Sequence, residues 1–422
     1  MNYPFPKDFL WGTSTAAYQV EGNNKSSDWW AIEKKTDPEI TESNGADHYN
    51  RFREDYTLAS DLSLNAQRLS LEWSRLEPKE GVFDEKEIAH YREVLKFLKD
   101  KNVKVFLTLH HFSNPLWFEA IGGWQNIIKA RKFFSRYVEV CVQEFSPLVD
   151  GFITINEPNL YAGMYPLKTY EEKGRLPILK VVRTFGDLLS AHVTAYKTIK
   201  KMRPEIAVGL SGNFALIHPF DGSIFSNIAS LIGNYFGISQ LSFVFRRYAD
   251  FIGLNYYYNL RARFNPLNPR SFYELYNGQG LIFSQGTSGT TVRFNLSEAN
   301  RGPDFSDLGW ETYPSGIYEV LRALRNLKKP IYITENGIAD ATDAKRERYI
   351  RDHLYYVWKA VNEGIDVRGY FYWSLIDNFE WFQGYKPRFG LIEVDYKTKE
   401  RKVRPSAHFL AQTAKNNSLL SS

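Results

Sequence analysis

Eight short apolar runs of β-forming residues recur along this 422-residue chain, and segments with helical periodicity separate most of them. Several runs are apolar at successive positions, which is typical of parallel strands covered on both faces. Between the second and third runs, Ile88, Tyr91 and Leu95 are spaced as on one face of a helix. The predicted strands cover residues 9–12, 66–71, 103–109, 151–155, 207–210, 251–254, 331–334 and 367–373.

This alternation favours one closed (β/α)8 barrel, the TIM-barrel form of an α/β protein, over a two-domain sheet protein. Length alone, at about 150 residues per domain, would suggest two or three domains, but barrels with insertions can exceed ~400 residues. We expect a single barrel over residues 1–415 with extended strand-to-helix loops, the longest at 213–245 and 261–310. Residues 416–422 form a short polar tail that we expect to fray.

Composition and charge narrow the function classes. Lys and Arg exceed Asp and Glu by 53 to 48, and this net charge of +5 gives no reason to expect a nucleic-acid or membrane partner. No basic segment followed by an apolar stretch opens the chain, and no window approaches the ~18 apolar residues of a membrane span. We therefore expect a cytoplasmic protein.

A single Cys argues against a disulfide framework. The 10 Trp, 27 Tyr and 30 Phe fit either a large core or a site for flat sugar or base rings.

Two glutamates follow predicted strands, at the end of a barrel where catalytic residues lie. The fourth run leads into Asn156-Glu157-Pro158, and the seventh leads into Glu335-Asn336-Gly337. Cleavage of a glycosidic bond needs two such carboxyl groups. One is protonated and assists the departing oxygen, while the other is ionised and attacks or activates water.

Each motif also has a purely structural interpretation. Asn156-Glu157-Pro158 could begin a helix, since Pro favours the first turn and Glu complements the helix dipole. Asn336-Gly337 could form a hairpin turn, but a helical pattern rather than a strand follows it. Two independent motifs at one barrel mouth together favour catalysis.

Polar and aromatic residues follow several other predicted strands. His110-His111 ends the third run, and a metal site is one interpretation of that pair. Because neighbouring strand residues point to opposite faces, only one His can face the barrel mouth, which argues against such a site. Residues 370–389 hold nine aromatics in twenty positions. The remaining candidates at strand ends are Arg68, Asn255, Tyr257, Trp373, Glu380 and Trp381.

With these motifs in this order, the sequence resembles glycoside hydrolase family 1, of the β-glucosidase type. The resemblance runs from Phe9-Leu10-Trp11-Gly12 to Arg388-Phe389-Gly390-Leu391 and on to Asp395. It implies a single (β/α)8 barrel, in agreement with the strand pattern. It also implies a retaining double displacement on a small β-glycoside or short oligosaccharide, without metal or cofactor, between carboxyl groups about 5–5.5 Å apart.

The resemblance also assigns roles by position. Glu157 corresponds to the general acid/base and Glu335 to the nucleophile. Arg68 and Tyr257 would flank the nucleophile and favour its charged form, and Asn255 lies beside them. The residues implied to bind the terminal sugar are Gln19, His111, Asn156, Trp373, Glu380, Trp381 and Phe389.

The sequence constrains the identity of the sugar less strongly than it constrains the catalytic residues. Relatives that cleave 6-phosphorylated glycosides replace the sugar-binding Glu and supply Lys and Tyr shortly afterwards, whereas this chain has Glu380, Pro387 and Phe389. Lys386 and Arg388 keep a 6-phospho-β-glycosidase open as a second hypothesis. We expect an exo-β-glucosidase with side activity on β-galactosides or β-fucosides. A transglycosylase or a non-catalytic carbohydrate-binding relative on the same fold is also compatible with the resemblance, although the latter would lack one carboxylate. The segment 111–114 also departs from the commoner family pattern, in which Trp and Asp follow the His.

Overall fold

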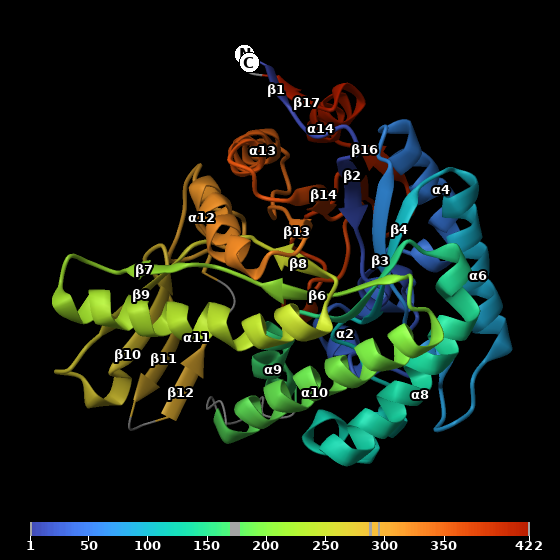
Figure 1. Ribbon diagram of the computed structural model, residues 1–422, viewed down its shortest axis with the longest axis horizontal. Coiled ribbons are helices and arrows are strands. Elements are labelled where there is room, and N and C mark those ends of the chain that lie inside the picture. Colours follow the sequence, from blue (N-terminus) through green and yellow to red (C-terminus); the bar gives the residue numbers. More distant parts are fainter. Residues whose placement is uncertain (1, 169–177, 287–288, 294–295, 421–422) are drawn as a thin grey trace.

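The eight predicted runs all form strands of one closed parallel barrel in the computed structural model, which describes residues 2–168, 178–286, 289–293 and 296–420 (Figure 1). The barrel order is β13-β14-β2-β3-β4-β5-β6-β8. Its strands are β2 (Leu10–Ser14), β3 (Ala66–Ser70), β4 (Lys104–His110), β5 (Gly151–Asn156), β6 (Ala207–Asn213), β8 (Phe251–Asn255), β13 (Ile331–Asn336) and β14 (Val367–Trp373).

Helices follow the strands and cover the outside of the barrel (Figure 1). The principal helices are α4 (His48–Asp61), α6 (Glu85–Asp100), α8 (Ile127–Phe145), α10 (Ile178–Met202), α11 (Ile224–Tyr248), α12 (Pro314–Leu324), α13 (Arg346–Asn362) and α14 (Pro405–Asn416). The predicted stripe on α6 is confirmed, because Ile88, Tyr91 and Leu95 are all buried. The fold is therefore the (β/α)8 barrel that the alternation predicts.

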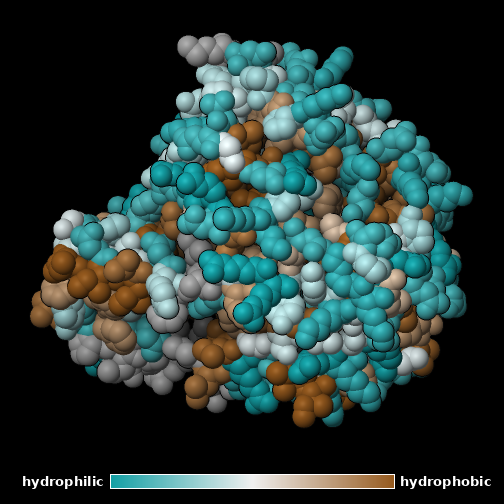
Figure 2. Space-filling view, viewed as in Figure 1, coloured by the Kyte–Doolittle hydropathy of each residue, from teal (hydrophilic) through white to brown (hydrophobic). Residues whose placement is uncertain are grey.

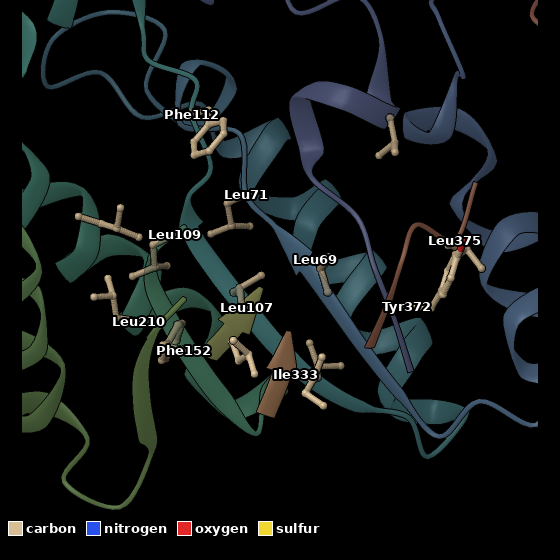
Figure 3. Close-up of a cluster of buried hydrophobic side chains, with 14 of the residues drawn as sticks. Leu69, Leu71, Leu107, Leu109, Phe112, Phe152, Leu210, Ile333, Tyr372 and Leu375 are labelled. Carbon is tan, nitrogen blue, oxygen red and sulfur yellow. The ribbon is translucent and has the colours of Figure 1, made fainter. Parts of the chain in front are cut away.

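Apolar side chains fill the barrel at one end and surround it on the outside. Each strand sends one side chain into the interior layer, which comprises Leu10, Ala66, Phe106, Ile153, Ala207, Phe251, Tyr332 and Phe371. The residues next to them point outward, and Leu69, Leu107, Phe152 and Ile333 belong to the large cluster outside the strands (Figure 3). This packing closes the amino end of the barrel, so only the carboxyl end can hold a pocket.

The two segments that we predicted as long strand-to-helix loops contain regular secondary structure, which corrects their description as weakly patterned loops. The first contains β7 (Ile217–Pro219) and most of α11, and the second contains β9 (Leu260–Phe264), β10 (Tyr273–Asn277), β11 (Gly280–Gly286) and β12 (Gly289–Val292). These five strands form one sheet in the order β12-β11-β10-β9-β7. With α11 they build a lobe beside the barrel (Figure 1).

Helix α11 escaped prediction because both of its sides are apolar. Leu241 and Phe245 are buried, whereas Leu231 and Tyr235 are 71% and 69% exposed. A helix without polar contrast gives no periodic signal. A brown patch lies over the lobe at the left of Figure 2, and the exposed apolar residues of α11 include Ile224, Phe225, Ile228 and Leu231. Contrary to our sequence expectation, α11 is long and apolar enough to cross a membrane by length and composition, although it packs on β9 and β7.

The C-terminal residues also differ from expectation. Ser418–Leu420 form β17, which pairs antiparallel with β1 (Asn2–Pro4). Leu419 is buried in this contact, so apolar burial and strand pairing hold a segment that we expected to fray.

Candidate active site

The two predicted carboxylates lie where the strand register changes. In β5 the pairing with β6 shifts between Ile153 and Asn156, and in β13 the pairing with β8 shifts between Ile333 and Glu335. Such irregularities re-aim side chains and recur next to active sites. The regular alternation of inward and outward side chains is therefore interrupted at two points. At each of them a Glu side chain enters the barrel mouth.

Glu157 occupies a constrained position between β5 and α9 (Pro158–Leu167). Its backbone is left-handed, with φ 42° and ψ 57°, a conformation uncommon outside glycine. Its side chain does not cap the helix but accepts hydrogen bonds from Nδ2 of Asn255 (2.7 Å) and Asn213 (3.0 Å). Burial, followed by the charge of Glu335, raises the pKa of Glu157 to about 8. Its carboxyl group is therefore protonated at neutral pH, as a general acid must be.

Glu335 is held at both oxygens. Tyr257 Oη donates to Oε2 at 2.6 Å, and the guanidinium of Arg68 donates to Oε1. Two donors on one carboxyl group suit a negatively charged nucleophile. The two glutamates thus occupy different environments, with amide donors around Glu157 and a cation beside Glu335.

A buried hydrogen-bond network connects the two glutamates. Arg68 is fully buried, and its Nη2 donates to Asn156 Oδ1 at 2.7 Å. Asn255 Nδ2 bridges Asn156 Oδ1 (3.1 Å) and Glu157 Oε1. The nucleophile candidate, the Arg, the Asn pair and the acid candidate therefore form one continuous chain of contacts. Such a network holds reacting groups in a fixed geometry.

A cavity of ≈ 730 Å³ opens above this network. The rings of Trp373, His111 and Trp381 stand nearly parallel, with centroids 5.8 Å and 6.2 Å from the imidazole. Such apolar ring faces can pack against the C–H face of a sugar. The predicted residues that line the cavity are Gln19, His111, Asn156, Glu157, Tyr257, Glu335, Trp373, Glu380, Trp381 and Phe389. Arg68 and Asn255 lie beneath and act through their hydrogen bonds.

Among the described residues that line the cavity, two have a buried side-chain atom without a hydrogen-bond partner, Gln19 Oε1 and His111 Nδ1. Asn156 Oδ1 already accepts from Arg68, so its Nδ2 is the donor to His111 Nε2 at 3.2 Å. The proton of the imidazole is then on Nδ1, since burial holds the pKa of His111 well below its usual value. Two residues of the cavity lining thus carry one unpaired acceptor and one unpaired donor, which a sugar hydroxyl could satisfy.

Glu380 adds a third carboxyl group to the cavity. Gln19 Nε2 donates to Phe379 O at 2.7 Å and lies 3.5 Å from Glu380 Oε2. Burial, followed by the charges of Glu335 and Glu157, raises the pKa of Glu380 to about 8. Its carboxyl group can therefore both donate to and accept from hydroxyl groups of a ligand.

Residues 112–114, where the chain departs from the commoner family pattern, mostly serve packing. Phe112 lines the cavity and stacks on Tyr161, with ring centroids 5.0 Å apart. Ser113 Oγ donates to the buried Glu72 at 2.7 Å, and Asn114 Oδ1 accepts from Trp124 Nε1 at 2.9 Å. The two polar side chains therefore point away from the cavity and stabilise its outer wall.

Sequence reasoning missed several residues of the cavity. Asn213 donates to Glu157, but our predicted strand stopped at residue 210, and only the observed strand end at Asn213 places it at the barrel mouth. Leu160 and Met164 lie one turn apart on α9, and no sequence motif marks them. The other missed lining residues are Phe112, Tyr258, Trp310, Phe382 and Gln383.

Lys386 and Arg388, the two residues that suggested a possible phosphate site, do not face the cavity. Arg388 Nη1 donates to Val394 O at 3.0 Å and to Asp377, and its guanidinium lies over the Tyr396 ring. Lys386 is exposed. Within the part of the chain that the structure describes, the cavity lining contains no Lys or Arg.

The sequence profile of glycosyl hydrolase family 1 matches residues 1–236 and 236–419, so the chain belongs to this family. The structure is similar to a β-glycosidase from Pyrococcus horikoshii, with a TM-score of 0.86 and 33% identity over 100% of this chain and 97% of that one. The protein is accordingly a family 1 glycosyl hydrolase.

Two curated relatives differ in their substrates. β-Glucosidase A of Thermotoga maritima is 29% identical, over 98% of both chains. 6-Phospho-β-galactosidase 1 of Streptococcus pneumoniae strain R6 is 30% identical, over 97% of this chain and 98% of the relative. Overall identity therefore does not separate free sugars from phosphorylated ones.

Proposed function

We propose that the protein is a retaining exo-β-glycosidase that removes unphosphorylated terminal β-D-glucosyl residues, with side activity on β-galactosides or β-fucosides. The observation that carries the choice of sugar is the cavity lining. Its residues Gln19 and His111 carry unpaired hydrogen-bonding atoms, and its described residues include no cation for a phosphate. A 6-phosphate buried there would lack the charged partner that such groups need.

The reaction would proceed in two displacements. Glu335 attacks the anomeric carbon while the bond to the leaving oxygen breaks, and Glu157 transfers its proton to that oxygen, which departs as an alcohol. Glu157, now ionised, then takes a proton from water. The resulting hydroxyl attacks the same carbon and displaces Glu335, so the β-configuration is retained.

Hydrogen bonds around the two carboxyl groups support these roles. Arg68 and Tyr257 donate to Glu335 and would stabilise it as a leaving carboxylate in the second step. Asn156 is fixed by Arg68 and Asn255 close to both glutamates, where its amide can contact the sugar 2-hydroxyl.

A panel of 4-nitrophenyl β-glycosides with and without a 6-phosphate tests the choice of sugar. We expect release of nitrophenol from the unphosphorylated glucoside and at least about 100-fold lower kcat/KM on its 6-phosphate. Turnover of the phosphorylated substrates alone would overturn the proposal in favour of a phospho-glycosidase.

Chemical rescue tests the nucleophile. Glu335→Gly should lose hydrolysis and regain turnover of the aryl glucoside when azide or formate is added, because a small anion can occupy the vacated position. Added acceptor alcohols then separate hydrolysis from transglycosylation. If most of the sugar passes to the alcohol at low acceptor concentration, the protein is a transglycosylase instead.

A further inference from the structure

A second cavity, of ≈ 1050 Å³ including its open mouth, adjoins the sugar pocket. Its walls come from α9, α10, the segment 213–217 and strands β9 to β12. Leu160, Met164 and Asn213 line both cavities. These three residues therefore lie between the two spaces, on one face of α9 and at the end of β6.

The boundary between the two cavities lies next to Glu157, the candidate general acid. Asn213 lines both cavities and donates to Glu157 Oε1 at 3.0 Å. In the proposed mechanism Glu157 protonates the leaving oxygen, so the leaving group begins beside Glu157. A long leaving group that extends past Leu160 and Met164 would enter the second cavity.

The walls of the second cavity are apolar. They include Val181, Ile217, Leu260 and Leu275, and none of the described lining residues is charged. The polar side chains among them belong to Asn159 and Asn213, and these two residues bond to each other. Asn159 Nδ2 donates to Asn213 O at 2.6 Å, and Asn213 N donates to Asn159 Oδ1 at 3.2 Å.

A second sugar ring would bring several hydroxyl groups against walls whose described side chains offer few hydrogen-bond partners, which is unfavourable. An alkyl chain would lose contact with water and gain aliphatic contacts, at about fourfold in affinity for each methylene buried. The surroundings therefore discriminate between the two kinds of leaving group.

We infer that the second cavity is the leaving-group site of this enzyme and that it accepts a linear alkyl aglycone. This inference rests on the proposed β-glycosidase function and specifies its substrate as an alkyl β-glycoside.

Gly163 allows the cavity to be filled without touching the sugar pocket. It lies on α9 and lines the second cavity but not the first. A Cβ at this position would meet nothing within 4 Å, so Gly163→Leu would place a side chain into open space. Gly186 is a matched control, because it is also helical, lies on α10, has nothing within 4 Å and lines neither cavity.

The experiment compares kcat/KM for methyl and n-octyl β-D-glucoside, below the micelle-forming concentration, in the wild type, Gly163→Leu and Gly186→Leu. The two alcohols are leaving groups of similar basicity, so the ratio reports binding of the chain. We expect the octyl glucoside to be favoured at least about 30-fold in the wild type and in Gly186→Leu. In Gly163→Leu the ratio should fall below about threefold, with hydrolysis of the methyl glucoside unchanged.

Three results would overturn the inference. Equal kcat/KM for both chain lengths in the wild type would exclude an alkyl site, and an unchanged preference in Gly163→Leu would place that site elsewhere. A higher kcat/KM for cellobiose than for the octyl glucoside would assign the site to a sugar. In each case hydrolysis of 4-nitrophenyl β-glucoside would leave the proposed function standing. If no β-glycoside is hydrolysed, both proposals fail.

Discussion

The sugar pocket and the adjoining apolar cavity are built on opposite principles. The pocket rests on side chains from barrel strands, joined by hydrogen bonds from Glu335 through Arg68 and Asn156 to Asn255 and Glu157. The cavity has aliphatic walls from helices and from the sheet of the lobe. Polar networks demand one geometry, whereas apolar contacts depend mainly on area and shape. If both proposals hold, the chemistry is rigidly specified, while the leaving group is selected by fit.

The largest effect should come from the centre of the network. Glu335→Gln removes the attacking carboxylate while nearly preserving its shape, so kcat should fall by on the order of 10⁶-fold. Steady-state rates on the aryl glucoside, with circular dichroism to confirm folding, measure this. A residual rate within tenfold of the wild type would mean that the pocket is not organised around Glu335.

The pH dependence should reveal the second glutamate. Because the pKa of Glu157 is raised to about 8, the acid form is present below that pH and is lost above it, so kcat/KM should decline on the alkaline side from about pH 8. In Glu157→Gln this decline should become smaller, with only the titration of Glu380 remaining, and kcat/KM for alkyl glucosides should fall by about 10²–10⁴-fold. An unchanged alkaline limb in that variant would assign the titration to another group.

A conservative change should show that the network needs geometry as well as charge. Arg68→Lys keeps the cation but loses the planar fork that reaches both Glu335 and Asn156, so kcat/KM should fall by about 10²–10³-fold. Arg53→Lys is the control, because the Arg53–Glu93 pair is exposed and its rearrangement should be nearly neutral. Equal kcat/KM for both variants would show that only the charge of Arg68 matters.

The smallest effect should come from the outer side of the lobe. Leu231→Lys places a charge on a 71% exposed position of α11 and should change the free energy of unfolding by no more than about 0.5 kcal/mol. Leu241→Ala on the buried side of the same helix should cost about 2–5 kcal/mol. Denaturant titration of both variants measures the contrast, and a large loss in Leu231→Lys would show that its surface is covered in solution.

Local signals in the sequence allowed prediction of the barrel and of the two glutamates, whereas the family resemblance supplied most of the residues of the sugar pocket. Strands buried on two faces are apolar throughout, and the site residues follow them directly, as Glu157 follows β5. Asn213 was missed because strand ends are set by pairing with neighbours, which one sequence does not display. The apolar cavity could not be predicted from the sequence for a related reason. Leu160 and Leu275 come from segments far apart in the chain, and only tertiary packing makes them neighbours.

The position of β2 has a consequence for how the molecule is assembled. This strand lies between β3 and β14, so one of its edges pairs with residues about fifty positions away and the other with residues more than 350 positions away. During synthesis the second edge must wait until nearly the whole chain has emerged, and until then an apolar strand edge is unpaired. Gln19 reaches Phe379 and Glu380 across the same seam. The sugar pocket is therefore complete only when β2 pairs with β14, and we expect a chain without this pairing to be inactive.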